Sequence, residues 1–194
     1  IRMLTHGTAP VRIQVFEESN CICDDSYKEP VPPKKKESSA SALSAAKRNP
    51  EGYSLSAIIR IPKARPWTTE DPFLYTLKIQ FGDDHVESYF AMRSFTVEPD
   101  EKGIPRFCLN HSPLFLHGVL DQGYWPDGLY TAPSDQAFVY DIRTMKELGF
   151  NMIRKHIKIE AARWYYHCDR LGIIVWQDMV SGGSSYSLPL VCYL

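Results

Sequence analysis

Residues 151–176 read NMIRKHIKIEAARWYYHCDRLGIIVW, and this stretch holds two short apolar strands with a helical pattern between them. Met152-Ile153 starts the first strand, and the helical segment 160–171 is ended by Gly172. The run 173–176 is then almost wholly apolar and has the length of a strand. Apolar strands that alternate with helices of this length are typical of a parallel sheet buried on both faces. The stretch therefore predicts part of an α/β fold.

The same alternation extends upstream. Residues 114–119 form another apolar run of strand length, and Ser134 has the position of an N-cap before a helix that Gly149 ends. From Pro105 onward the pattern is thus β-α-β-α-β. Rossmann-type folds share this order, but no G-x-G-x-x-G follows the first strand, so a dinucleotide site is not expected.

Polar residues follow all three strands at the point where each strand ends. They are Asp121-Gln122, Arg154-Lys155-His156 and Gln177-Asp178. In a (β/α)8 barrel, side chains at the carboxyl ends of the strands point into the active site. Any one of these residues could instead be a hydrogen-bonded group of the barrel rim, but three successive strands that end this way favour a site.

The first half of the chain has a different period. Apolar and polar residues alternate in 11–16, 55–61, 74–81, 86–90 and 94–97, and Gly82-Asp83-Asp84 supplies a turn. This pattern predicts a small antiparallel sandwich. The polar stretch of about 19–52, which contains Pro30, Pro32, Pro33 and Lys34-Lys35-Lys36, is interpreted as a solvated insertion with room for one helical turn.

Composition narrows the class of protein. The formal net charge is −1, which gives no reason to expect a nucleic-acid partner, and no apolar run reaches the roughly 18 residues that span a bilayer. The five cysteines match neither a disulfide framework nor a zinc spacing, so we expect free thiols, no metal, no cofactor and, by a small margin, a cytoplasmic location. The chain starts at Ile1, and we expect that the true N-terminus is missing.

Several ordered motifs resemble glycoside hydrolase family 2, which includes β-galactosidases, β-glucuronidases and β-mannosidases. The signature runs from Asn151 and Arg154 through Trp164-Tyr165 and Asp169 to the apolar run after Gly172, without a gap. Three further motifs agree with the family pattern: Pro66-Trp67 with 72–77, Phe90-Ala91-Met92-Arg93 with Ala where Gly is usual, and Leu116-His117-Gly118-Val119. Gln122 and the run 155–159 depart from the galactosidase-like pattern, which leaves the sugar open.

The resemblance implies an immunoglobulin-like β-sandwich over 1–98, followed by the N-terminal part of a (β/α)8 TIM barrel over 99–194. It also implies a retaining β-glycosidase, in which two Glu residues at the ends of the fourth and seventh barrel strands act as acid/base and nucleophile. About 90 residues follow Pro105, against about 250 in a whole barrel, so there is room for three β-α units. We therefore expect both catalytic Glu residues beyond Leu194, and no activity of this chain alone.

The resemblance also implies roles for the strand-end residues. Arg154 would reach under the sugar toward the nucleophile, Asp178 would brace either Arg154 or the sugar, and Lys155 and His156 would donate to sugar hydroxyls. Asp121 and Gln122 complete the predicted substrate-binding set. Tyr124 and Trp125, in the loop after the first strand, are candidates for stacking on a sugar face, although both are also ordinary packing residues. Asp121 and Asp178 are not expected to form a catalytic pair.

Two other interpretations remain open. A sandwich with a remnant barrel would bind carbohydrate without cleaving it, and an unrelated barrel enzyme would make the sandwich motifs coincidental. The expected partner is a carbohydrate β-glycoside, with neither nucleic acid nor membrane, and the full-length parent is a candidate homo-oligomer.

Overall fold

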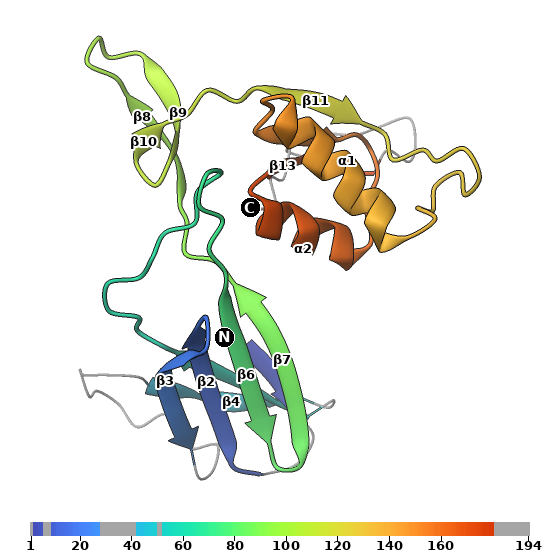
Figure 1. Ribbon diagram of the computed structural model, residues 1–194. Coiled ribbons are helices and arrows are strands. Elements are labelled where there is room, and N and C mark those ends of the chain that lie inside the picture. The colour runs from blue at the N-terminus through green and yellow to red at the C-terminus, as the bar shows by residue number, and fades with distance from the viewer. Residues whose placement is uncertain (1, 6–8, 28–41, 50–51, 181–194) are drawn as a thin grey trace. The chain divides into compact units, whose positions relative to one another are not determined.

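The computed structural model describes residues 2–5, 9–27, 42–49 and 52–180 (Figure 1). The chain forms two compact units. The first unit contains 1–65 and 74–90, and the second contains 66–73 and 91–194. In the part of the chain that is described, neither helix is long and apolar enough to cross a membrane.

The first unit is built from two antiparallel sheets, as the alternating pattern predicted. One sheet has the order β3-β2-β6-β7, with β2 Val11–Glu17, β3 Asn20–Tyr27, β6 Tyr75–Phe81 and β7 Asp84–Phe90. The other has the order β1-β5-β4, with β1 Arg2–Thr5, β4 Ala42–Asn49 and β5 Gly52–Ile58. Val11, Ile13 and Val15 are buried at every second position of β2, which is the burial pattern of one covered sheet face. The sandwich is therefore confirmed.

The interpretation of 19–52 as a solvated polar insertion was wrong for residues 20–27 and 42–49. Residues of this stretch form β3, which pairs with β2, and β4, which pairs with β5 where one helical turn had been expected. β3 is an edge strand, and its Asp24 accepts two hydrogen bonds from Arg12 across the strand pair, at 2.8 and 2.5 Å. Polar residues can occupy the exposed face of an edge strand. The polar composition of β3 therefore did not distinguish it from a loop. Lys34-Lys35-Lys36 lies outside the described residues.

The second unit contains the three parallel strands that the sequence predicted. β11 Gly118–Asp121, β12 Met152–Lys155 and β13 Ile174–Gln177 form one sheet in the order β11-β12-β13. In its register Asp121 lies opposite Lys155, and Lys155 lies opposite Gln177. The strands are joined through helices α1 Asp135–Glu147 and α2 Ala162–Leu171. Ser134 caps α1 as predicted, since its side chain accepts a hydrogen bond from the Ala137 amide, and Gly172 ends α2 with a left-handed φ of 77°.

The two faces of this sheet differ. Ile153 packs with Phe138 and Ile142 of α1 and with Trp164 and Cys168 of α2, so the odd-numbered strand residues face the helices. Successive strand residues point to opposite faces, so Leu120, Arg154 and Trp176 lie on the other side. All three are exposed. Helices therefore cover one face of the sheet, and the other face is buried at Met152 and Ile174 but exposed toward the carboxyl end, where Arg154 lies.

A small antiparallel sheet precedes β11. It consists of β8 Phe95–Pro99, β9 Pro105–Leu109 and β10 Ser112–Pro113. The sequence analysis expected 94–97 to close the sandwich, but β8 pairs with β9 in the second unit. Asp100 makes this hairpin possible, because its Oδ1 accepts hydrogen bonds at 2.9 Å from the Lys102 and Ile104 amides in the turn.

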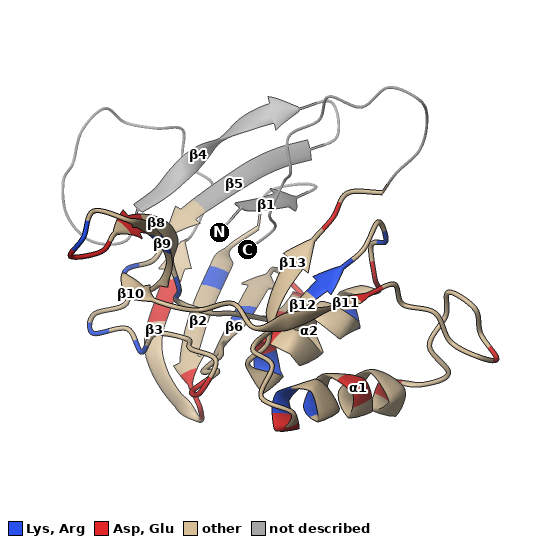
Figure 2. Ribbon diagram, turned by 90° about the horizontal axis from the view of Figure 1, so that it is seen from above, with Lys and Arg blue, Asp and Glu red and all other residues tan. Residues whose placement is uncertain are grey.

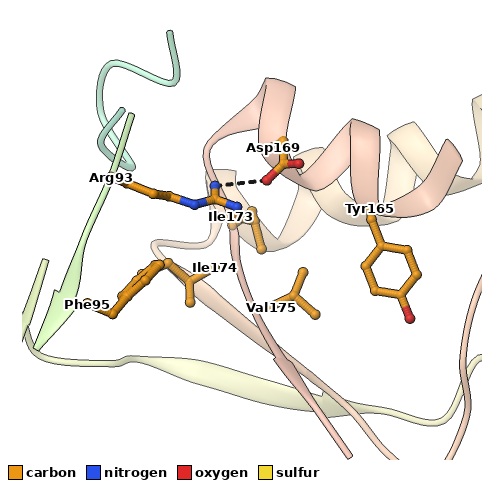
Figure 3. Close-up of a pocket in the computed structure, with 7 residues that line it drawn as sticks. All are labelled: Arg93, Phe95, Tyr165, Asp169, Ile173, Ile174 and Val175. Atoms are coloured by element: carbon orange, nitrogen blue, oxygen red, sulfur yellow. Dashed lines mark hydrogen bonds and ion pairs between the residues drawn. The ribbon is translucent and has the colours of Figure 1, made fainter. Parts of the chain in front are cut away.

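Trp67 is the centre of a polar junction within the second unit. Its side chain is fully buried, and its indole Nε1 donates to the Asp169 carbonyl at 2.7 Å. The Arg93 guanidinium lies 4.6 Å from the centre of the Trp67 ring and donates to Asp169 Oδ1 at 2.8 Å (Figure 3). Three motifs that are far apart in the sequence thus meet in one contact. It ties 66–73 and the residues after Ala91 to α2.

A second contact supports the same junction. Lys146 near the end of α1 donates from Nζ to the carbonyls of Thr69 and Leu171, both at 2.5 Å. Burial lowers the pKa of this lysine. The cation also neutralises the partial negative charge at the end of α2, where carbonyls lack helical partners.

Replacing Trp67 with Phe should lower the free energy of unfolding by about 1–3 kcal/mol, because the Asp169 carbonyl loses its donor and a small cavity is left. Urea unfolding followed by far-ultraviolet circular dichroism measures this. Trp176→Phe, on the open face of the sheet, is the matched control and should change stability by less than about 0.5 kcal/mol. Equal effects of the two substitutions would show that the junction is not a stabilising contact.

Candidate functional site

The strand-end residues gather at the carboxyl edge of the β11-β12-β13 sheet, because parallel strands present the same ends together. Figure 2 shows basic residues on the arrow of β12 and acidic residues just beyond β13. The alternation of side chains divides the predicted set into two groups on opposite faces of the sheet. Arg154 and Asp178 form one group, and Asp121 and Lys155 form the other.

Arg154 and Asp178 form a two-point ion pair. Arg154 Nε is 3.1 Å from Asp178 Oδ1, and Arg154 Nη2 is 3.0 Å from Asp178 Oδ2. The Asp178 backbone amide donates to the Lys155 carbonyl at 3.0 Å, which continues the spacing of the sheet. The Asp178 side chain is 9% exposed and that of Arg154 is 47% exposed. The carboxylate therefore holds the guanidinium in a fixed plane while the rest of the cation faces the open side.

Lys155 lies on the helix side of the sheet. Its side chain is 1% exposed, and Nζ is 2.5 Å from Asp121 Oδ2 and 3.1 Å from Glu160 Oε1. The same ammonium lies 4.3 Å from the centre of the Trp164 ring. Two carboxylates and an aromatic face surround this cation, so it braces β11 against β12. That position differs from the position of a lysine that is free to donate to a sugar hydroxyl.

The sequence analysis missed Glu160 and Lys158, which extend this cluster into the loops. Lys158 Nζ is 2.7 Å from Glu160 Oε1 and donates to the carbonyls of Gly123 and Tyr130 at 2.8 and 2.7 Å. Gly123 has a φ of 68°, and a Cβ there would lie 2.5 Å from Glu160 Oε1. Only glycine fits at this position. The loop after β12 therefore holds the loop after β11 through one lysine.

Gln177 closes the cluster beneath the loop after β12. It is buried, its Oε1 accepts a hydrogen bond from Tyr165 Oη at 2.5 Å, and its Nε2 donates to the Lys158 carbonyl at 2.7 Å. Tyr165 Oη in turn accepts from the Glu160 amide at 3.1 Å. Side chains of a strand alternate between the two faces of a sheet. This alternation could have predicted from the sequence that residues 121, 155 and 177 share one face and that 154 and 178 share the other.

The remaining candidates occupy different environments. Gln122 is exposed, and the His156 amide donates to the Asp121 carbonyl at 2.9 Å. His156 Nδ1 is buried and has no hydrogen-bond partner within the described ranges. Trp125 packs edge-on against Phe138, with ring centres 5.9 Å apart, whereas Tyr124 is exposed. Of the two candidates for stacking, Tyr124 is therefore the one that presents its ring to solvent.

A cavity of about 260 Å³ lies elsewhere in this unit (Figure 3). Its walls include the first residues of β13, Ile174 and Val175, together with Phe95 and the Arg93–Asp169 ion pair. The cavity thus borders the start of β13 and not its carboxyl end, and its basic group is paired within the wall. We therefore place the candidate site at the strand ends.

Comparisons with known proteins find relatives among glycoside hydrolases. Residues 7–93 match the family described as Glycosyl hydrolases family 2. A β-galactosidase of Photobacterium profundum is 26% identical over 189 residues, and the match covers 92% of this chain but 17% of the relative. A putative β-glucuronidase of Formosa agariphila is 30% identical over 126 residues, covering 62% of this chain and 14% of that relative. This chain spans less than a fifth of either protein.

A solved structure shows the same fold over most of the chain. The β-glucuronidase of Parabacteroides merdae superposes with a TM-score of 0.68 at 22% identity, covering 89% of this chain and 19% of that one. At this level of identity the likeness concerns the fold alone.

Lys155→Met should lower the free energy of unfolding by about 3–5 kcal/mol, because Asp121 and Glu160 would lose a buried cation. Thermal unfolding of the unsubstituted protein and of the Lys155→Met variant, under the same conditions, measures this difference. Lys78→Met is the control, since Lys78 is half exposed and pairs with Glu87 at 3.3 Å on the sandwich. Surface pairs contribute about 0–1 kcal/mol, so a Lys155 effect of only that size would contradict a buried bracing role.

Proposed function

Because this chain belongs, as a partial member, to glycoside hydrolase family 2, we propose that the protein of which it forms part is a retaining β-glycosidase. Its substrate class is a carbohydrate with a β-glycosidic bond. The observation that carries the proposal is the Arg154–Asp178 pair, which holds a half-exposed cation at the carboxyl edge of a parallel sheet.

We propose that β11, β12 and β13 are the first three strands of a (β/α)8 barrel. In such a barrel the helices cover the outer face, and site residues project from the carboxyl ends of the strands. The sheet supports this assignment, since α1 and α2 pack on one face and Arg154 lies on the other. In this architecture the unit of 1–65 and 74–90 is the sandwich domain, and the barrel begins within the unit of 66–73 and 91–194.

The proposed mechanism assigns Arg154 an electrostatic role. A retaining glycosidase uses two carboxyl groups about 5–5.5 Å apart, one a nucleophile that must stay ionised. A fixed cation close to that carboxylate favours its charged form. Asp178 would keep the guanidinium oriented, because it binds two of its nitrogens. Arg154 would then stabilise charge that changes during the reaction.

The acid/base and the nucleophile are proposed to be Glu residues beyond Leu194. Asp121 and Asp178 are poor candidates for these roles, since each carboxylate is paired with its own cation, Lys155 and Arg154. The oxygens of both carboxylates are engaged by these cations, so neither is free to attack an anomeric carbon.

The test begins with the full coding sequence, expressed and assayed on a panel of aryl β-glycosides. Nuclear magnetic resonance of the first product anomer reports retention or inversion. Hydrolysis with retention would support the proposal. Sugar binding without hydrolysis of any member of the panel would instead identify a non-catalytic carbohydrate-binding protein.

Within that enzyme, Arg154→Ala should lower kcat by about tenfold or more, which corresponds to at least ~1.4 kcal/mol of transition-state stabilisation. The substitution acts on kcat because the lost interaction changes along the reaction. Steady-state kinetics on the best aryl β-glycoside measures this. Arg163→Ala is the matched control, since Arg163 on α2 pairs with Asp135 at 2.6 Å and is half exposed. An unchanged kcat in Arg154→Ala would remove this residue from the site.

A further inference from the structure

The loop after β11 carries an exposed pair of tyrosines whose function the proposed mechanism does not explain. Tyr124 and Tyr130 are 58% and 57% exposed. Their ring centres lie 4.6 Å apart with an interplanar angle of 41°, and their hydroxyl oxygens are 2.5 Å apart. Each ring therefore holds the other in place while part of its surface stays open to solvent. We refer to Tyr124 and Tyr130 together as the tyrosine platform.

The loop beneath the platform is fixed by its backbone. The Trp125 amide donates to the Leu129 carbonyl at 2.7 Å, and the Leu129 amide returns a bond to the Trp125 carbonyl at 3.0 Å. Trp125 anchors this turn by packing its ring on Phe138 of α1. Lys158 binds the carbonyls of Gly123 and Tyr130 on either side of the turn. A ligand would therefore meet two rings that are already ordered, at a small cost in conformational entropy.

The chemistry of the platform favours a neutral ligand. Lys158 is the cation beside Tyr130, 5.4 Å from its ring centre, but its ammonium already binds two carbonyls and Glu160. Hydrogen bonding to Tyr130 raises the pKa of Tyr124. The platform thus offers aromatic faces and neutral hydroxyls. A pyranose ring presents the matching surfaces, with C–H groups on its face and hydroxyls around its edge.

The location ties the platform to the candidate site. Asp121 at the end of β11 accepts a hydrogen bond on Oδ1 from the Gly123 amide at 2.7 Å, so the loop starts directly at the carboxyl edge of the sheet. The same edge carries Arg154 and Asp178. A sugar that is bonded to the ring being hydrolysed would extend from this edge.

We propose that Tyr124 and Tyr130 bind a second sugar ring of the substrate, next to the ring whose glycosidic bond is cleaved. This inference rests on the proposed function and narrows the substrate class to β-linked disaccharides or longer saccharides. Tyr130 and the supporting Lys158 become specificity-determining residues, while Trp125 holds the loop from the core.

The test compares two substrates of the full-length enzyme that share the cleaved sugar. One is a β-glycosyl fluoride, whose leaving group is too small to reach the platform, and the other is a β-linked disaccharide. Tyr124→Ala and Tyr130→Ala should each raise KM for the disaccharide about threefold to tenfold and leave kinetics on the fluoride unchanged. Tyr124→Phe and Tyr130→Phe keep the rings and should retain most of the affinity.

Tyr140→Ala is the matched control, since Tyr140 is 71% exposed on α1. This substitution should change the kinetics on neither substrate. Equal losses on the fluoride and the disaccharide would overturn the inference, because they would indicate a damaged site. An unchanged KM for the disaccharide would overturn it as well.

Direct binding separates this inference from the proposed function. If the full-length protein hydrolyses neither substrate, the proposed function fails. Saturation-transfer nuclear magnetic resonance with the disaccharide then tests whether the tyrosine platform binds sugar. Transfer that is lost in Tyr124→Ala and kept in Tyr140→Ala supports a sugar-binding platform, whereas equal transfer in all three proteins rejects it. Self-association that Tyr124→Ala abolishes, without a change in sugar binding, would instead make the pair an interface between copies of this chain.

Discussion

The geometry of the strand ends depends on one buried ammonium. Lys155 is surrounded by Asp121, Glu160 and the ring of Trp164, and its side chain is only 1% exposed. An uncompensated charge in that position would be costly, so both carboxylates must stay where they are. Because one belongs to β11 and the other to the loop after β12, the lysine sets the separation of these two segments. Lys158 binds both Glu160 and the Gly123 carbonyl, so it also fixes the position of the loop after β11.

The junction around Trp67 has a comparable place in the architecture of the second unit. Trp67, Arg93 and Asp169 belong to three separate motifs of the family resemblance, and they meet one another away from the strand ends. These motif residues therefore have a structural role in the second unit. Here their common contact joins 66–73 and the residues after Ala91 to α2. That arrangement gives the motif spacing a structural cause as well as a functional one.

The sequence predicted elements better than it predicted roles. Apolar runs and helix ends at Ser134 and Gly172 located the three parallel strands and both helices, because these signals are local. β3 escaped detection since an edge strand can be polar, and Glu160 escaped since its partners come from distant segments. Neighbours Arg154 and Lys155 look equivalent as polar strand-end residues. Only the face that the helices cover distinguishes the cation that is open to solvent from the cation that is enclosed.

Lys158 holds the loop after β11 by its carbonyl oxygens and not by its side chains. Every residue type has such a carbonyl, so the frame does not depend on which side chains occupy positions 124 and 130. Substitution at these two positions can therefore change the side chains that the loop presents without loosening the scaffold. This separation makes the loop a suitable place to introduce new side chains by engineering.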